Sequence, residues 1–274
     1  MRIGWKDQLT FSASAMIPSA MMAPAIPDSS TPRLSMTCSN PDLPVDGSNL
    51  CIQAARAFFE NHTPEPSIAS LGIHLNKEIP FGAGLGGGSS DAATVLEACS
   101  LLTSAPKRDR LLHMGALLGS DVPFFLKSPV AFGTGRGEIL QDMSFPTALV
   151  GTWLVLAVPD ERVNTAEAYR HIVPNDSLLS DLRTNIEHGD LQDWTQNVHN
   201  DFELSVFKSY PIVAELKQQM FDLGAGFSLM SGSGSSVFGV FGDRAEASHA
   251  VAMLAERWPA FTYWSGPAEM PDTA

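Results

Sequence analysis

The chain has 274 residues, a length that corresponds to one large domain or two smaller ones. Hydrophobic residues make up 44% and charged residues 17%, which is too apolar for a disordered chain and sufficient for a sizeable core. The formal net charge is −13, so the chain lacks the basic surface of a general nucleic-acid binder. Almost all of this charge lies in residues 138–274, which hold 7 basic and 19 acidic side chains, whereas residues 77–127 hold 5 of each.

Cysteine usage and hydropathy predict a cytoplasmic protein that does not enter a membrane. The three cysteines have no C-x-x-C spacing, which favours reduced thiols over a disulfide framework or a zinc site. The longest apolar run, Ala148–Val158, is too short to span a bilayer. Met16–Ile26 follows two basic residues as the apolar part of a signal peptide would, but Asp7, Pro18 and scattered serines along the first 20 residues disfavour that interpretation. We therefore expect an irregular loop in this region.

In the first half of the chain, the spacing of apolar residues predicts a mixture of strands and helices. Ser48 or Asn49 is expected to cap the first helix, and Gly119 is expected to end the third. The predicted order is a strand at 3–12, a loop or insertion at 13–35, a helix from 50, a strand at 71–76, a glycine-rich loop at 80–88, and helices at 90–103 and 109–118.

Beyond residue 137 the pattern becomes more acidic and contains more strands. Asn164 or Thr165 is expected to cap the first helix of this half. We place the domain boundary near residue 147, which gives an N-terminal domain of residues 1–147 and a C-terminal domain of residues 148–274. The predicted order is a buried strand at 149–158, helices at 165–172, 176–197 and 201–222, strands at 227–230 and 237–241, a helix at 243–257 and a strand at 261–264.

The glycine-rich loop has the composition of a phosphate-binding segment. Five of the seven residues from Gly82 to Gly88 are glycine, and Ser89 and Ser90 follow at the start of a predicted helix. Glycine lets the backbone approach an anion without a Cβ in the way, and the N-terminus of a helix adds free amides and a positive partial charge. Residues 79–90 carry no charged side chain, so backbone amides would provide the binding.

Two common phosphate-loop patterns do not fit this segment. The pattern G-x-x-x-x-G-K-[ST] requires lysine where this chain has Gly88. The dinucleotide pattern G-x-G-x-x-G fits the glycine spacing, but Pro80 interrupts the strand that should precede it. Three of the four residues at 107–110 are basic, near the position where that pattern expects an acidic residue. A flexible linker is disfavoured because a proline and an amphipathic helix flank the glycines.

Asp121 is the candidate catalytic acid or base. It follows the end of a predicted helix closely and precedes Val122-Pro123, a pair that is expected to be extended because proline disfavours helical backbone at the residue before it. A carboxylate on such a stiff turn would be held in place. From the residues alone, a solvated aspartate in a turn remains the alternative.

The segment from Gly82 to Ala93 resembles the second motif of the GHMP kinases, whose general form is P-x-x-x-G-L-G-S-S-A. The triple glycine followed by Ser-Ser-Asp-Ala-Ala is most similar to the 4-diphosphocytidyl-2-C-methyl-D-erythritol kinases of this superfamily. The resemblance implies an α+β, two-domain GHMP kinase fold, with a ribosomal protein S5 domain 2-like N-terminal domain and a ferredoxin-like C-terminal domain. It implies a cytoplasmic enzyme that uses ATP and Mg²⁺ to phosphorylate a small-molecule substrate, with no nucleic-acid or membrane partner.

The resemblance also implies roles for individual residues. Gly-x-Asp-Val-Pro resembles the family segment that carries the catalytic aspartate, here Asp121. Thr165 and Tyr169 lie in a segment that resembles the mouth of the substrate pocket and are expected at the cytidine end, although helix capping and packing explain them equally well. Ser90 is the expected Mg²⁺ ligand. The implied ATP-binding residues are Pro80, Phe81, Gly82, Ala83, Gly84, Leu85, Gly86, Gly87, Gly88, Ser89 and Ser90.

Three further segments resemble family motifs. Gly224–Phe238 resembles the third GHMP motif, and Ser231–Ser233 are expected to support the phosphate loop. Asn200–Glu203 matches an Asn-Asp-x-Glu signature, for which we expect a structural role. Asn49-Leu50 corresponds to the border of the adenine pocket.

Two motifs of the family do not occur in the sequence: a strand with Lys-x-Asn, which supplies a catalytic lysine, and Asp-Gly-Tyr-His, which recognises cytosine. Lys6 does not match the first of them. A start codon assigned too far downstream would explain the difference, and so would a degenerate variant. We expect the chain as printed to bind ATP poorly and to show little or no kinase activity.

Two other functions remain open at this point. Another GHMP kinase with a different small alcohol would share the loop and Asp121, and activity with homoserine or mevalonate would identify it. A nucleotide-binding protein without phosphoryl transfer would also keep the loop, and tight ATP binding without transfer would identify it.

Overall fold

The computed structural model describes residues 1–15, 31–62, 68–103, 108–170, 172 and 179–269. Two compact units share these residues. The first contains Lys6–Ile79 and Gly86–Gln141, and the second contains Met1–Trp5, Pro80–Leu85 and the chain from Asp142. The chain thus passes from the first unit to the second and back within the glycine-rich segment. A domain boundary at residue 147 stays a prediction.

The first unit is built on a three-stranded sheet of order β1-β3-β2. β1 (Gln8–Ala15) is antiparallel to the central strand β3 (Ile68–Asn76), and β2 (Arg33–Cys38) is parallel to it. Every second residue in the middle of β3 is buried: Leu71, Ile73 and Leu75. This period of two gives the sheet one apolar face and one Ser/Thr-rich face.

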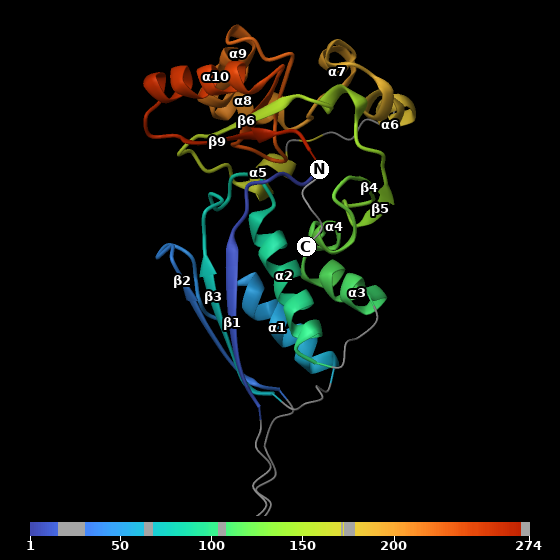
Figure 1. Cartoon of the computed structure of the whole chain (residues 1–274), viewed down its shortest axis with the longest axis vertical. Helices are drawn as coiled ribbons and strands as arrows, with labels where there is room; N and C mark the ends of the chain where they lie inside the picture. Colours follow the sequence, from blue (N-terminus) through green and yellow to red (C-terminus); the bar gives the residue numbers. More distant parts are fainter. Residues whose placement is uncertain (16–30, 63–67, 104–107, 171, 173–178, 270–274) are drawn as a thin grey trace, which may run out of the picture. The chain divides into compact units, whose positions relative to one another are not determined.

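Helices α1 (Leu50–Asn61) and α2 (Gly87–Leu101) lie on the apolar face of that sheet (Figure 1). Phe58 of α1 and Leu96 of α2 are fully buried in the shared core. α3 (Arg108–Leu118) and α4 (Val122–Lys127) pack against α2, and a hairpin of β4 (Ala131–Thr134) and β5 (Ile139–Asp142) follows. The sequence patterns did not predict this hairpin.

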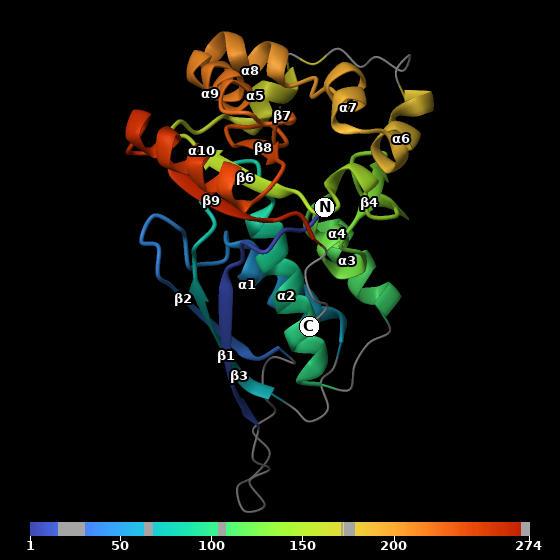
Figure 2. The same cartoon turned by 45° about the horizontal axis from the view of Figure 1, so that its top comes forward.

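The second unit contains a four-stranded antiparallel sheet of order β7-β8-β6-β9. Its strands are β6 (Trp153–Val158), β7 (Phe227–Met230), β8 (Val237–Phe241) and β9 (Thr262–Pro267). Helices α9 (Pro211–Asp222) and α10 (Arg244–Arg257) share a core with the sheet, and Figure 2 shows α10 beside β6 and β9. The chain order strand, helix, two strands, helix, strand with this sheet order is the ferredoxin-like arrangement, so the predicted α+β fold class is confirmed.

Shorter elements complete the second unit. They are a 3₁₀ turn at Thr147–Leu149, α5 (Thr165–Arg170), α6 (Leu179–His188), α7 (Leu191–Asn197) and α8 (Glu203–Ser209). Among the described residues, no helix combines the length and the apolar character that crossing a membrane requires.

Several predicted bounds were wrong. The strand predicted at 3–12 begins only at Gln8, and the one predicted at 149–158 begins at Trp153. The helix predicted at 201–222 is divided into α8 and α9 before Pro211, because proline has no amide hydrogen and belongs in the first turn of a helix. The helix predicted at 176–197 is divided at Gly189, where a Cβ would lie 2.5 Å from the carbonyl oxygen of Asn185.

Candidate active site

The glycine-rich loop depends on its glycines for its backbone conformation. Gly82, Gly84 and Gly86 have φ angles of 74°, 76° and 69°, in the left-handed region that side chains with a Cβ rarely adopt. Gly84 has a second constraint, because a Cβ there would lie 2.4 Å from the carbonyl oxygen of Ser231. The loop therefore needs glycine at these positions for a physical reason that does not involve a ligand.

A Ser/Gly turn between β7 and β8 holds the first half of this loop within the second unit. The Ser231 hydroxyl donates to the Gly84 carbonyl oxygen at 2.9 Å. The hydroxyl and the amide of Ser236 donate to the Ala83 carbonyl oxygen at 2.5 and 3.2 Å. Ser236 is fully buried, so these bonds are shielded from water. Sequence reasoning named Ser231 as a supporting residue and missed Ser236.

The Asn-Asp-x-Glu segment in turn holds the Ser/Gly turn. The Asn200 side-chain amide donates to the carbonyl oxygens of Met230 and Gly232, each at 2.8 Å. A Glu203 carboxylate oxygen accepts from the Met230 amide at 2.9 Å, and the other oxygen pairs with Lys217 at 2.6 Å. The structural role expected for this segment is thus visible as a set of hydrogen bonds that fix the turn.

The second half of the loop is the N-terminus of α2. Gly86 occupies the cap position and has no side chain to bind the first amides of the helix. Within the described part of the chain, the amides of Gly87, Gly88 and Ser89 have no hydrogen-bond acceptor, and the first turn holds no acidic residue. Such an end combines free donors with the positive end of the helix dipole, which suits an anion such as phosphate.

Asp121 lies in the first unit, at the residue before α4. Its carboxylate is exposed and does not cap the helix, and the Ser120 hydroxyl lies 3.3 Å from one oxygen. The extended backbone predicted for Val122-Pro123 was wrong, because both residues begin α4. Proline fits there since an amide in the first turn has no intrahelical partner to lose. α4 packs against α2, so the carboxylate belongs to the same packed unit as the free end of α2.

The residues near the loop provide one hydroxyl ligand for Mg²⁺ and no dedicated protein cage. The Ser90 hydroxyl is half-buried in the first turn of α2 and makes no hydrogen bond within the described part of the chain. Among the residues that the structure describes, no group of three or more His, Cys, Asp or Glu side chains gathers to hold a metal ion. Mg²⁺ commonly takes one or two protein oxygens together with substrate phosphates, so this donor set fits a nucleotide-bound Mg²⁺.

The two residues expected to contact substrate lie in α5 of the second unit. The Thr165 hydroxyl lies 3.2 Å from the Ser233 hydroxyl, and Asn164 caps the helix by accepting from the Glu167 amide. The Tyr169 ring is 61% exposed and packs edge-on against Phe202 with centroids 4.8 Å apart. Neither side chain is needed for the core of the unit.

Asn49 has a local role in the first unit. Its side-chain oxygen accepts from the Cys51 amide at 2.9 Å, which confirms it as the cap of α1, and its amide donates to the Pro44 carbonyl oxygen. The expected border of an adenine pocket at Asn49-Leu50 stays a prediction.

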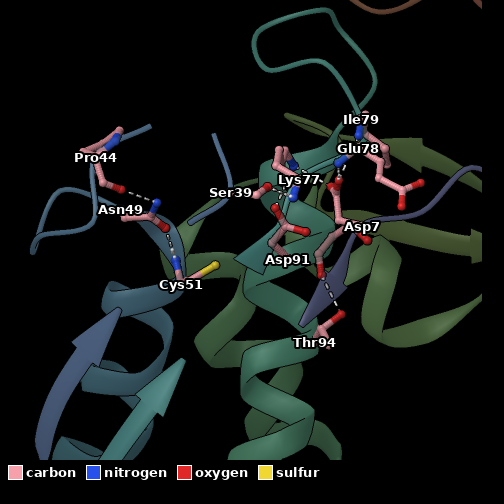
Figure 3. Close-up of polar contacts among 11 residues, drawn as sticks. Asp7, Ser39, Pro44, Asn49, Cys51, Lys77, Glu78, Ile79, Asp91 and Thr94 are labelled. Atoms are coloured by element: carbon pink, nitrogen blue, oxygen red, sulfur yellow. Dashed lines mark hydrogen bonds and ion pairs between the residues drawn. The ribbon is translucent and has the colours of Figure 1, made fainter. Parts of the chain in front are cut away.

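Sequence reasoning missed a buried charge cluster beside the loop, formed by Asp7, Lys77 and Asp91 (Figure 3). The Lys77 ammonium lies 2.5 Å from an Asp7 oxygen and 2.7 Å from an Asp91 oxygen. The side chains of Lys77 and Asp7 are each 3% exposed, and that of Asp91 is 5% exposed. The charged residues are 70 and 14 positions apart in the chain, so no local pattern could indicate the cluster.

The cluster holds two negative charges and one positive charge when all three groups are ionised. The pKa of Asp91 is raised to about 6, mainly by burial. The Asp7 carboxylate adds to the rise, and Lys77 opposes it. Burial alone lowers the pKa of Lys77, but the two carboxylates outweigh burial and the net pKa lies above its ordinary value. A proton on Asp91 would balance the cluster.

We expect the stability of the protein to depend on pH through Asp91. The folded pKa of about 6 lies above the ordinary value of 3.8, so the folded state binds a proton more tightly than the unfolded state does. The stabilisation from this proton is fully present below about pH 4 and is lost as the pH rises to about 6. Across that range the free energy of unfolding of the wild type should fall by about 1–3 kcal/mol relative to Asp91→Asn. Urea titrations of both proteins measure this, and a difference that stays constant with pH would contradict it.

Comparisons with known proteins agree with this arrangement. The family model for the GHMP kinases N terminal domain matches residues 49–128, and the model for the GHMP kinases C terminal matches residues 182–260. The first match contains the glycine-rich loop and Asp121, and the second contains the Ser/Gly turn. These two matches define the class of protein as the GHMP kinases.

Proteins that match over nearly the whole chain identify the family within the GHMP kinases. A 4-diphosphocytidyl-2-C-methyl-D-erythritol kinase of Chloroherpeton thalassium is 40% identical over 266 residues, which are 94% of this chain and 84% of that protein. A crystal structure of 4-(cytidine 5'-diphospho)-2C-methyl-D-erythritol kinase matches with a TM-score of 0.72 and 30% identity, over 95% of this chain and 85% of the other. The chain therefore belongs to the 4-diphosphocytidyl-2-C-methyl-D-erythritol kinase family.

A more distant neighbour shares the fold. The crystal structure of homoserine kinase from Cytophaga hutchinsonii has a TM-score of 0.71 at 15% identity, over 96% of this chain and 86% of the other. The same fold thus occurs in proteins named for a different small substrate.

Proposed function

We propose that this protein transfers the γ-phosphoryl group of ATP to the 2-hydroxyl of 4-diphosphocytidyl-2-C-methyl-D-erythritol, a step of non-mevalonate isoprenoid precursor synthesis. The observation that carries this proposal is the free, uncharged N-terminus of α2 behind a glycine loop, in a chain 40% identical to a kinase of that name. The cytoplasm, where ATP is abundant and thiols stay reduced, is the proposed location.

In this proposal, Pro80–Ser90 bind the nucleotide. The amides at the start of α2 donate to phosphate oxygens, and the left-handed glycines keep side chains away from them. Mg²⁺, when bound to the nucleotide, neutralises charge on the phosphates, and Ser90 is the residue that would hold it. No basic side chain within residues 79–90 provides charge, so amide dipoles replace the lysine of other phosphate loops.

Asp121 would act on the substrate alcohol. Its carboxylate accepts the proton of the 2-hydroxyl while the hydroxyl oxygen bonds to the γ-phosphorus and the bond from that phosphorus to the bridging oxygen of ADP breaks. Exposure and the absence of a capping bond leave the carboxylate available for this role. Thr165 and Tyr169 are proposed to contact the cytidine end of the substrate.

Binding of the alcohol tests the substrate assignment independently of the rate of turnover. In isothermal titration calorimetry with ADP and Mg²⁺ present, we expect 4-diphosphocytidyl-2-C-methyl-D-erythritol to bind and homoserine and mevalonate to give no heat. Binding of either of the other alcohols in its place would identify a different GHMP kinase. Binding of ADP with none of the three would favour a nucleotide-binding protein without this activity.

A further inference from the structure

The cluster of Asp7, Lys77 and Asp91 connects the three chain segments that meet where the chain enters and leaves the glycine loop (Figure 3). Asp7 immediately precedes β1, Lys77 immediately follows β3, and Asp91 lies in the second turn of α2. All three belong to the same compact unit. The cluster is therefore a cross-link between two neighbouring strands and the helix whose free end is proposed to bind phosphate.

Asp7 also holds the backbone that leads into the loop. One oxygen of its carboxylate accepts from the amides of Glu78 and Ile79 at 2.7 and 2.8 Å, and the other accepts from the Lys77 ammonium. The Lys77 amide donates to the Ser39 hydroxyl at 2.8 Å. Three consecutive residues directly before Pro80 thus have fixed amide groups, so the position of the loop entrance is determined by one carboxylate and one hydroxyl.

Lys77 lies against the exit of the loop as well. A Cβ on Gly87 would be 3.0 Å from the Lys77 nitrogen, so the ammonium lies directly beside the first residue of α2. The nitrogen is directed at the two carboxylates and its side chain is 3% exposed, which leaves it little access to a ligand in solvent. A buried ion pair is weak evidence for stability, and in some proteins such a pair instead fixes one geometry.

We propose that Lys77 is a positioning residue for nucleotide binding, an inference that rests on the proposed function. Through Asp7 and Asp91, Lys77 fixes the entrance and the exit of the glycine loop. Lys77 does not itself contact the phosphates. Removing the ammonium leaves the loop ends without their common partner. The free amides of Gly87, Gly88 and Ser89 then lose their fixed direction. The loss of one hydrogen bond to a charged phosphate weakens binding by roughly 10- to 100-fold.

A positioning role for Lys77 and direct binding of phosphate by Lys77 predict different effects of removing Asp91. A lysine that bound phosphate would be restrained by Asp91, so removing that carboxylate would leave nucleotide affinity unchanged or increase it. A lysine that acts through Asp91 makes the two side chains dependent on each other, and a double-mutant cycle measures this dependence. Asp91→Asn keeps an oxygen acceptor for the ammonium and serves as the conservative variant.

The experiment measures the dissociation constant of the fluorescent nucleotide mant-ADP for Lys77→Met, Asp91→Ala, the double variant and Asp91→Asn. We expect Lys77→Met and Asp91→Ala each to weaken binding, and Lys77→Met to do so by about 10- to 100-fold. The double variant should bind no more weakly than Lys77→Met. Asp91→Asn should bind within about threefold of the wild type. Lys208→Met, the same substitution at an exposed lysine, is the matched control and should bind like the wild type. Additive losses, or normal affinity in Asp91→Ala, would overturn the proposal.

Hydrogen exchange tests the positioning role separately from the proposed function. It also shows whether a variant has lost its fold as a whole or only the order of the loop. In the folded protein without nucleotide, the amides of residues 78–90 should exchange at least about tenfold faster in Asp91→Ala than in the wild type, while those of β6–β9 stay unchanged. Unchanged exchange at 78–90 would overturn the positioning role even if nucleotide binds. A wild type that does not bind mant-ADP but shows the exchange difference would contradict the proposed function and leave the positioning of the loop supported.

Discussion

Gly84→Ala should cost at least about 3 kcal/mol of the free energy of unfolding and abolish measurable binding of mant-ADP. At φ 76° an L side chain is strained by roughly 1–2 kcal/mol before any contact is counted. The new Cβ would also lie 2.4 Å from the Ser231 carbonyl oxygen and 2.9 Å from that of Gly234. Both contacts are to backbone, so relief requires the loop or the Ser/Gly turn to move. Urea denaturation and fluorescence titration measure the two effects.

Gly82→Ala is the matched control for this prediction. Gly82 has nearly the same backbone angle, φ 74°, but a Cβ there would meet nothing within 4 Å. The control should therefore lose only the conformational term of roughly 1–2 kcal/mol. If Gly84→Ala is as stable as Gly82→Ala, the close approach of the loop to the Ser/Gly turn is not a feature of the folded protein.

Asp121→Asn should reduce phosphoryl transfer by about 10²- to 10⁴-fold, the range expected for the loss of a general base. Asparagine has nearly the same shape and remains before α4, but it cannot accept the proton of the substrate hydroxyl. Because Asp121 makes no capping bond, the substitution should change the free energy of unfolding little. Single-turnover transfer with enzyme in excess over ³²P-labelled ATP measures the rate, and mant-ADP titration measures nucleotide affinity, which should stay within about threefold of the wild type.

Asp109→Asn removes a carboxylate from the same unit and is the control for a general effect of charge. Asp109 is exposed in the first turn of α3 and is remote in sequence from the loop. Its transfer rate should equal that of the wild type. Transfer by Asp121→Asn within tenfold of the wild type would show that Asp121 is not the group that accepts the proton.

Local sequence patterns predicted the regular elements well where a single physical rule dominates. The strands at Phe227–Met230 and Val237–Phe241 have the predicted bounds, because each is a short apolar run next to glycine and serine. The predicted cap of α1 at Asn49 is confirmed, because its side chain accepts from an amide of the first turn. The loop was found from composition alone, since so many glycines in seven residues have few other uses.

Predictions failed where two local rules compete or where distant residues meet. The rule that proline disfavours helix before it predicted extended backbone at Val122-Pro123, but the preference of proline for the first turn of a helix prevailed. Ser236 and the cluster of Asp7, Lys77 and Asp91 depend on contacts between segments far apart in the chain. Nothing in a local pattern distinguishes a buried lysine beside a loop from a solvated one.

The distribution of charge agrees with the proposed chemistry. Both proposed substrates are polyanions, and a net charge of −13 would repel them if it were spread evenly. Residues 79–90 carry no charge, and the free amides of α2 lie within them. The loop can therefore bind phosphate without a basic patch.

The central claim, that the chain is a kinase for a cytidine-linked alcohol, is tested most directly by following the γ-phosphoryl group. ATP labelled with ³²P at the γ-phosphorus is mixed with Mg²⁺ and equimolar amounts of 4-diphosphocytidyl-2-C-methyl-D-erythritol, homoserine and mevalonate. The protein is held in excess over the ATP, so that even a single slow turnover is detected, and the labelled products are separated. We predict that the label appears in the cytidine compound, as a phosphate monoester on its 2-hydroxyl, and that this label is lost in Asp121→Asn. Label in homoserine or mevalonate, or only in inorganic phosphate, would contradict the claim.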